Sequence, residues 1–204
     1  MIFYTIIRKI FVIYLTLFNR WFIKGKENIP ENGPVVIIAN HVSYWDPVIF
    51  ACSVHRPVHF MAKEELFKVP LFGRIISALY AFPIKRGQTA DRNALRIATK
   101  LLKNKEILGL FPEGTRSKTG DLLPFHPGAA LFALRASAPI VIMYIHGSKT
   151  TFPLSLRGNI KVIIGKPIVY EDLLEKKFTS EDVERVTSDI MEEMRRLQKD
   201  VSVY

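Results

Sequence analysis

Six short apolar runs, separated by segments with helical periodicity, constrain the fold of this 204-residue chain more than any other feature. The runs are continuous, as in Val-Val-Ile-Ile-Ala at 35–39, which is typical of strands buried on both faces of a sheet. They lie at 35–39, 58–61, 79–84, 107–111, 140–145 and 160–164. Helical spacing of apolar residues marks 47–54, 70–78, 91–103, 128–136 and 180–199. Strands that alternate with helices predict a single α/β domain whose largely parallel or mixed sheet is covered by helices.

The chain is basic, with 29 Lys and Arg against 19 Asp and Glu and a formal net charge of +10. Such a balance indicates a polyanionic partner: nucleic acid, an anionic membrane surface or a phosphorylated substrate. The basic residues are dispersed, however, and the sequence has neither a dense Lys/Arg run nor an RNA-binding motif with interleaved aromatics. We therefore expect no nucleic acid among the partners. Because Cys52 is the one cysteine, an internal disulfide is excluded.

Residues 1–24 form an apolar segment that lacks the marks of a secretory signal or a spanning helix. Arg8 and Lys9 divide the apolar run, no small-residue cleavage site follows, and the longest run, 10–18, is half of the roughly 20 residues that a spanning helix needs. On a helical wheel, a basic strip with Arg8, Lys9 and Arg20 opposes a broad apolar face. That face contains Phe3, Ile7, Ile10, Phe11, Tyr14, Phe18, Trp21 and Phe22.

Two interpretations of this segment stand. It is either a helix that lies in the interface of an anionic membrane, with Trp21 and Tyr14 near the headgroups, or a terminal helix packed on the protein's own core. The large aromatics on one face and the positive charges opposite favour the first. We therefore predict an amphipathic membrane-associating helix over 1–24, which precedes an α/β domain over 25–204.

Candidate catalytic residues follow the first predicted strand. In open α/β sheets, sites gather outside the carboxyl ends of the strands, and His41 and Asp46 come directly after 35–39. A histidine beside a carboxylate can act as a general base, because the carboxylate fixes the tautomer and stabilises the imidazolium that forms. Asp46 before Pro47 equally fits a helix N-cap, and the two roles can coexist.

Arginine follows two further predicted strands, with Arg86 after 79–84 and Arg116 after 107–111. The planar guanidinium group grips phosphate at two points. Gly114, two residues before Arg116, allows backbone N–H groups to approach an anion. Taken alone, this turn is better explained by a solvated surface arginine, but its expected place beside His41 makes phosphate binding an equal alternative.

Other chemistries lack their sequence signatures. The chain has no G-x-S-x-G elbow of a serine hydrolase, no P-loop and no dinucleotide fingerprint. The five histidines lack the close paired spacing of a zinc site, so we expect neither a metal nor another cofactor. Cys52 falls within a predicted apolar helix, which indicates a buried, inert thiol rather than a nucleophile.

The segment 40–46 reads Asn-His-Val-Ser-Tyr-Trp-Asp, and 111–117 reads Phe-Pro-Glu-Gly-Thr-Arg-Ser. Together with 81–87, 125–130, 138–141 and 165–168, in this order, they resemble the sequence blocks of the glycerolipid acyltransferases, which begin with the pattern NHxxxxD. Among these enzymes the chain is similar to the 1-acylglycerol-3-phosphate (lysophosphatidic acid) acyltransferases. It departs from their pattern at Tyr80, where many members have Gly, and at His126, where Lys is common.

The resemblance implies transfer of a fatty acyl group from acyl-CoA or acyl carrier protein to the sn-2 hydroxyl of lysophosphatidic acid, giving phosphatidic acid for phospholipid biosynthesis. It implies His41 as the general base with Asp46 as its partner. It assigns the substrate phosphate to Arg86, Glu113, Gly114, Thr115, Arg116 and Lys63. It also implies peripheral or monotopic attachment to an anionic membrane, at the cytoplasmic face of the cell membrane.

Three alternatives to this function stay open. The acceptor could be glycerol-3-phosphate or another lysolipid. The protein could be a non-catalytic module that binds anionic lipid, or a lipid hydrolase that needs no acceptor.

Overall fold

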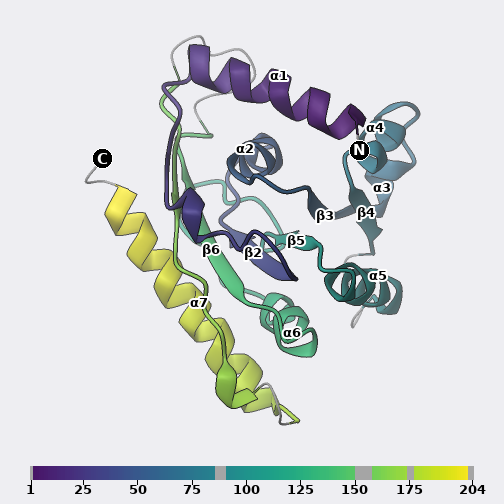
Figure 1. Ribbon diagram of the computed structural model, residues 1–204, viewed down its shortest axis with the longest axis vertical. Coiled ribbons are helices and arrows are strands. Elements are labelled where there is room, and N and C mark those ends of the chain that lie inside the picture. The colour runs from purple at the N-terminus through teal and green to yellow at the C-terminus, as the bar shows by residue number, and fades with distance from the viewer. Residues whose placement is uncertain (1, 86–90, 150–157, 174–176, 202–204) are drawn as a thin grey trace.

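The computed structural model describes residues 2–85, 91–149, 158–173 and 177–201 (Figure 1). The helices are α1 (Ile2–Phe18), α2 (Asp46–Ser53), α3 (Glu64–Phe67), α4 (Phe72–Ala78), α5 (Arg92–Lys103), α6 (Gly128–Arg135) and α7 (Ser180–Asp200), with short 3-10 turns η1 (Lys26–Asn28) and η2 (Glu171–Leu173). The strands are β1 (Phe22–Lys24), β2 (Val35–Ala39), β3 (Val58–Lys63), β4 (Ala81–Ile84), β5 (Ile107–Leu110), β6 (Ile140–His146) and β7 (Lys161–Ile164).

Within the described residues, the strands form one seven-stranded sheet in the order β1-β7-β6-β2-β5-β3-β4. The five strands from β6 to β4 run parallel, whereas β7 is antiparallel to β6 and β1 is parallel to β7. This mixed α/β sheet confirms the predicted fold class. The carboxyl ends of β2, β5, β3 and β4 therefore meet at one edge of the sheet, which we call the carboxyl edge.

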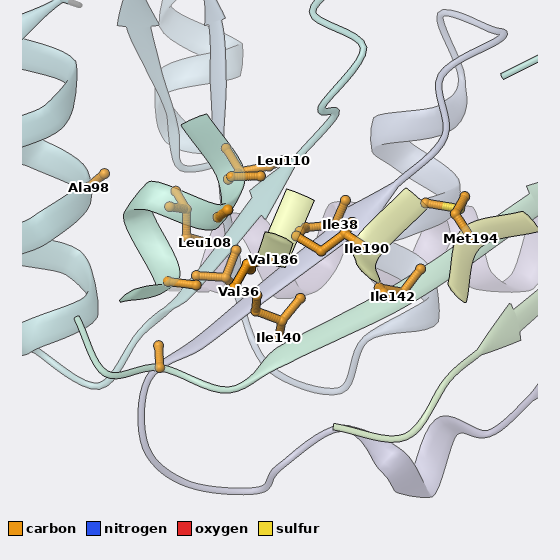
Figure 2. Packing of buried hydrophobic residues seen from close by; sticks show 14 of the residues in the cluster. Val36, Ile38, Ala98, Leu108, Leu110, Ile140, Ile142, Val186, Ile190 and Met194 are labelled. Carbon is orange, nitrogen blue, oxygen red and sulfur yellow. The ribbon is translucent and has the colours of Figure 1, made fainter. Parts of the chain in front are cut away.

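Helices cover both faces of the sheet (Figure 1). On one face, Val36, Ile38 and Ile140 pack against the apolar stripe of α7 and against α5 and α6 (Figure 2). That stripe consists of Val186, Ile190, Met194 and Leu197, and it follows the predicted helical spacing. The other face is covered by α2, with α1 lying outside it (Figure 1). Each central strand is thus buried on both sides, which explains its continuous apolar run.

The N-terminal segment differs from the predicted helix over 1–24. The helix ends at Phe18, because the backbone turns at Arg20, where φ is +39°. Phe22, which we expected on the apolar face of the helix, instead lies in β1 and pairs with Lys161 of β7. A three-residue strand at the end of an apolar helix leaves no periodicity of its own, so the sequence did not reveal it.

Apolar side chains lie on both the buried and the exposed face of α1. Tyr4 and Leu15 are buried, and Phe11, Tyr14 and Trp21 pack half-buried beside the core. The opposite face exposes Ile2, Phe3, Ile6, Ile10, Ile13, Leu17 and Phe18. Of the predicted membrane-facing residues, Phe3, Ile10 and Phe18 are therefore exposed, and Ile7 is half-buried. No helix in the described ranges combines the length and the hydrophobicity that crossing a bilayer requires.

Arg8 also differs from its predicted place in a solvent- or membrane-facing basic strip. Its guanidinium donates hydrogen bonds to the carbonyl oxygens of Ala51 (3.1 Å) and Cys52 (3.2 Å), at the C-terminal end of α2. A cation at this end is favoured by the helix dipole and satisfies carbonyls that lack a partner within the helix. Arg8 thus fastens α1 to α2, whereas Lys9 and Arg20 are exposed.

Candidate functional site

The loop after β2 begins with a buried anchor. The side-chain amide of Asn40 donates to the carbonyl of Ile145 (3.0 Å) and accepts from the backbone N–H of the same residue (2.7 Å). This pairing continues the contact between β2 and β6 beyond the last backbone bonds of the strand. It fixes the point at which the chain leaves the sheet and turns into His41.

His41 and Asp46 meet at the carboxyl edge, as the sequence predicted. The Nδ1 atom of His41 lies 2.9 Å from Oδ2 of Asp46. The same Oδ2 accepts hydrogen bonds from the backbone N–H groups of Val42 (2.6 Å) and Ser43 (2.7 Å), so three donors converge on one buried oxygen. The carboxylate is held rigidly within its own loop, and it holds the imidazole in turn.

This geometry assigns the tautomer of His41. Since Nδ1 faces a carboxylate oxygen that already accepts two N–H groups, Nδ1 carries the proton and Nε2 presents its lone pair. No described residue hydrogen-bonds Nε2. The ring stacks on Phe111 at a centroid distance of 4.2 Å, and the side chain is 14% exposed. The unprotonated nitrogen of His41 is therefore free to take a proton from a bound molecule.

Asp46 does not act as the N-cap of α2. It is the first residue of the helix, the N-cap position is held by Trp45, and no side chain makes a capping bond there. The Asp46 carboxylate instead turns back to the preceding loop, because the N–H groups of Val42 and Ser43 lie within its reach. The following Pro47 occupies the first turn, where a missing N–H costs nothing.

Glu113 lies inside the protein rather than at the surface expected of a phosphate contact. Its Oε1 accepts the backbone N–H of His41 (2.7 Å), and its Oε2 accepts that of Leu123 (3.0 Å). The residue is only 3% exposed, and burial raises the pKa of its carboxyl group. Glu113 therefore joins the loop after β2 to the segment around residue 123. Its position supports His41, which differs from the predicted role in phosphate binding.

The rest of the loop after β5 wraps around His41. Gly114 has a φ of +64°, and a side chain there would also press on the ring of His126, so glycine fits this turn. The N–H of Ser117 donates to the carbonyl of His41 (2.8 Å). Thr115 is exposed. The guanidinium carbon of Arg116 lies 3.4 Å from the ring centroid of Tyr44, in the loop that carries His41.

Lys63 and Arg86 are the two other predicted phosphate ligands, and the structure describes only the first of them. Lys63 is exposed at the end of β3 and lies beside Ile84 of β4, at the carboxyl edge. Arg86 lies outside the described residues, two positions after Ile84. The structure thus brings together His41, Asp46, Gly114 and Arg116, with Lys63 two strands from β2 at the same edge.

Sequence reasoning missed three contributors to this site. Asn40 and Phe111 belong to the recognised segments, and Tyr44 occupies a position that the pattern NHxxxxD leaves open. The signal for Asn40 was a buried-strand end followed by an amide, which needs partners when buried. No sequence signal reveals that Tyr44 stacks on Arg116, because that contact joins two loops far apart in the chain.

Two other predictions concern groups outside the His41–Asp46 pair. Cys52 is buried, and burial raises the pKa of its thiol to about 12, so a reactive thiolate is disfavoured at neutral pH. Among the described residues, no group of His, Cys, Asp and Glu side chains is arranged to hold a metal ion.

A His–Asp pair held at the carboxyl edge of an α/β sheet, with an arginine in the neighbouring loop, has the geometry that base-assisted chemistry on an anionic molecule requires. The sequence matches the family model described as Acyltransferase over residues 20–146, which is more than half of the chain. This chain belongs to the acyltransferase family. The family match includes both loops that build the site.

Individual relatives agree with this membership. The chain is 33% identical to the 1-acyl-sn-glycerol-3-phosphate acyltransferase of Bacillus subtilis over 149 residues, which cover 72% of this chain and 73% of the relative. It is 31% identical to the enzyme of the same name from Streptococcus pneumoniae over 99% of this chain and 75% of that one. Some other relatives are longer, and the match covers about half of their length or less.

The fold is similar to a solved structure. The crystal structure of the 1-acyl-sn-glycerophosphate (LPA) acyltransferase from Thermotoga maritima superposes with a TM-score of 0.80 at 26% identity, covering 98% of this chain and 80% of that one. The similarity extends over nearly all of this chain and so includes the N-terminal helix as well as the sheet.

Proposed function

We propose that this protein transfers a fatty acyl group from an acyl thioester to the sn-2 hydroxyl of 1-acylglycerol-3-phosphate, producing phosphatidic acid. The observation that carries the proposal is the His41–Asp46 pair, whose geometry leaves Nε2 of His41 as a free base at the carboxyl edge. The names of the relatives supply the substrate class. The donor is acyl-CoA or acyl carrier protein.

The reaction follows from this free base. Nε2 of His41 takes the proton of the acceptor hydroxyl as its oxygen attacks the thioester carbonyl carbon. Asp46 stabilises the imidazolium that forms, since its buried carboxylate lies 2.9 Å from Nδ1. The tetrahedral intermediate then collapses, the C–S bond breaks, and the leaving thiolate takes the proton from His41. No acyl-enzyme intermediate is needed, so no nucleophilic side chain is required.

The phosphate of the acceptor binds beside this base. Arg116 is the best-placed described cation, because it lies on Tyr44 of the His41 loop. Its guanidinium can grip two phosphate oxygens while the ring supports its face. Arg86 and Lys63, which follow neighbouring strands, complete the proposed phosphate site.

The acceptor is an amphiphile, and α1 supplies a surface on which it is delivered. The exposed face of α1 holds large apolar side chains, and Lys9 and Arg20 lie near it. Such a helix binds in the interface of an anionic membrane. We place the protein at the cytoplasmic face of the cell membrane, attached peripherally through this helix.

Thioester consumption, followed over a panel of lysolipid acceptors with both CoA and carrier-protein donors, tests this function. We expect turnover that requires 1-acylglycerol-3-phosphate and falls by roughly 10²–10⁴ in folded His41→Ala, the usual contribution of a general base. Release of free fatty acid without an acceptor would indicate a hydrolase. Absence of turnover with every pair would indicate a lipid-binding module. Turnover with glycerol-3-phosphate as the only active acceptor would identify glycerol-3-phosphate, and not 1-acylglycerol-3-phosphate, as the acceptor.

A further inference from the structure

The hairpin formed by α3 and α4 exposes an apolar patch that the site does not use. It joins the end of β3 to the start of β4 and packs on β4 at the border of the sheet. Five of its exposed side chains are large and apolar, and we call them the hairpin patch: Leu66, Val69, Leu71, Phe72 and Ile75. Only Gly73 of α4 is buried. A single exposed leucine needs no explanation, but five within ten residues do.

The tip of the hairpin holds one of these side chains in a strained turn. The N–H of Phe72 donates to the carbonyl of Pro70 (2.7 Å), which closes a three-residue turn around Leu71. Leu71 has φ +65° and ψ −52°, the rare and strained hand of the γ-turn. Glycine adopts positive φ without steric cost, whereas leucine does not. The chain nevertheless places leucine here, with 70% of its surface exposed.

Two unfavourable features, the backbone strain at Leu71 and the exposure of its apolar side chain, are not compensated by any contact within the described protein. The hairpin is tightly folded, since a side chain at Gly73 would collide with the carbonyl oxygen of Phe67. Leu71 is therefore presented rigidly and points away from the core. Backbone strain that persists at an exposed position is a reason to look for a function there, and an apolar side chain in water is stabilised by an apolar phase.

The hairpin patch adjoins the exposed face of α1. Tyr80, two residues after α4, packs its ring against Tyr4 of α1 at a centroid distance of 5.1 Å. Tyr4 in turn accepts a hydrogen bond from the N–H of Val58, at the start of β3. The first turn of α1, with Ile2 and its exposed neighbours, thus begins beside α4, as Figure 1 shows. The hairpin and the N-terminal end of α1 therefore lie at the same corner of the molecule.

The hairpin carries two cations and two carboxylates, and one of the cations has no ion-pair partner among the described residues. Arg74 is exposed on α4, and no described carboxylate lies within ion-pair distance of it. Lys68 is exposed and forms one pair with Glu64 (3.5 Å). Glu65 is the other acidic residue of the hairpin. Apolar side chains flanked by cations are the pattern of a segment in the membrane interface.

We propose that the hairpin patch is a second membrane-contacting surface, in which Leu71 and Phe72 enter the boundary between headgroups and acyl chains. The inference deepens the proposed function, since the bilayer holds the proposed acceptor. A single interfacial helix leaves the domain able to roll about the helix axis. A second contact at one end of α1 and off its axis removes this freedom, so the carboxyl edge keeps one orientation to the lipid surface.

Vesicle partitioning of the full chain tests the proposal. Sedimentation with vesicles of phosphatidylcholine and phosphatidylglycerol is compared for wild type, the double variant Leu71→Ser with Phe72→Ser, and the control Val169→Ser. Val169 is exposed to a similar degree (49% against 45% for Phe72) but lies beside the start of β6, separated from β4 by three strands. We expect the hairpin variant to lose about tenfold or more in partitioning, since two large apolar side chains no longer leave water, and the control to match wild type.

Leu71→Gly keeps the test independent of folding. Glycine relieves the strained turn, so its Tm should equal or exceed that of wild type, while its partitioning should fall. Wild-type partitioning of both hairpin variants would overturn the proposal, as would an equal loss in Val169→Ser. A dimer that dissociates in the hairpin variants without lipid would assign the patch to self-association instead. The vesicle assay contains no substrate, so it tests membrane contact independently of acyl transfer. If the hairpin variants lose partitioning but the wild-type protein transfers no acyl group, the membrane surface is supported and the proposed function is refuted.

Discussion

Asp46→Asn separates the charge of the Asp46 carboxylate from its position. In the structure one oxygen, Oδ2, accepts all three hydrogen bonds, whereas no described group hydrogen-bonds Oδ1. An asparagine can therefore place its single carbonyl oxygen where Oδ2 lies and its amide nitrogen where Oδ1 lies. The N–H groups of Val42 and Ser43 hold this orientation, because the flipped amide would face three donors. The tautomer of His41 is preserved, and only the negative charge is lost.

The magnitude follows from the distance between the two groups. Unit charges about 4 Å apart at an effective dielectric constant near 20 attract by about 4 kcal/mol. This is the most that the carboxylate can contribute to the imidazolium, and it corresponds to roughly a thousandfold in rate. We expect kcat to fall by about 10²–10³ with a small change in the KM for the acceptor. The buried amide N–H without a partner should lower stability by about 1–3 kcal/mol.

Steady-state thioester consumption, with kcat and KM measured separately and Tm recorded for each variant, checks this expectation. His41→Ala and the double variant serve as controls. In the proposed mechanism Asp46 acts only through His41, so adding Asp46→Asn to His41→Ala should cost almost nothing further. A folded Asp46→Asn with a kcat within threefold of wild type would refute the reasoning, and so would additive losses in the double variant.

Three further predictions test the surroundings of the pair. In Glu113→Gln one amide oxygen must replace two carboxylate oxygens, each of which accepts a backbone N–H. Tm should therefore fall by several degrees, and kcat should fall with it. An unchanged Tm would contradict a role of Glu113 in joining the two segments. Tyr44→Leu should raise the KM for the acceptor several-fold more than that for the donor, and Tyr44→Phe should restore it, because the ring rather than the hydroxyl supports Arg116; Tyr44 is 72% exposed, so equal Tm values are expected. Burial lowers the pKa of His59, and the nearby charge of Glu106 partly opposes this shift. As the pH falls, the imidazole therefore takes up its proton in the unfolded chain before it does so in the folded protein, and the free energy of unfolding should decrease below about pH 6.5. Denaturation of His59→Gln should show a weaker pH dependence of stability in that range.

The sequence was most informative where burial sets the pattern. The strands at 35–39 and 107–111 were recognisable because both faces of a parallel sheet are apolar, and the residues after them had to meet at one edge. The pairing of His41 with Asp46 lies within one short loop, so local spacing sufficed to predict it. The chemistry proposed for the pair rests on the residue types and on the family resemblance, because spacing alone left a structural role open.

Contacts between distant segments were beyond the reach of the sequence. The family resemblance assigned Glu113 to the substrate phosphate, and only the structure shows that it is buried and that two backbone N–H groups compensate its burial. The helical wheel placed Arg8 in a basic strip, whereas in the structure it closes the end of α2. In both cases a charged side chain hydrogen-bonds to backbone groups. Because nearly every residue has the same backbone N–H and C=O groups, the sequence does not reveal such partners.

The strand β1 links the two ends of the chain in a way that bears on biosynthesis. It pairs only with β7 within the described sheet, and β7 follows all the other described strands along the chain. Until β7 leaves the ribosome, the connection from α1 has no neighbouring strand, although α1 itself emerges before every strand of the described sheet. Pairings of such high sequence separation form late in folding. The apolar helix therefore meets the lipid or a chaperone while the sheet is still open, and membrane encounter can precede completion of the fold.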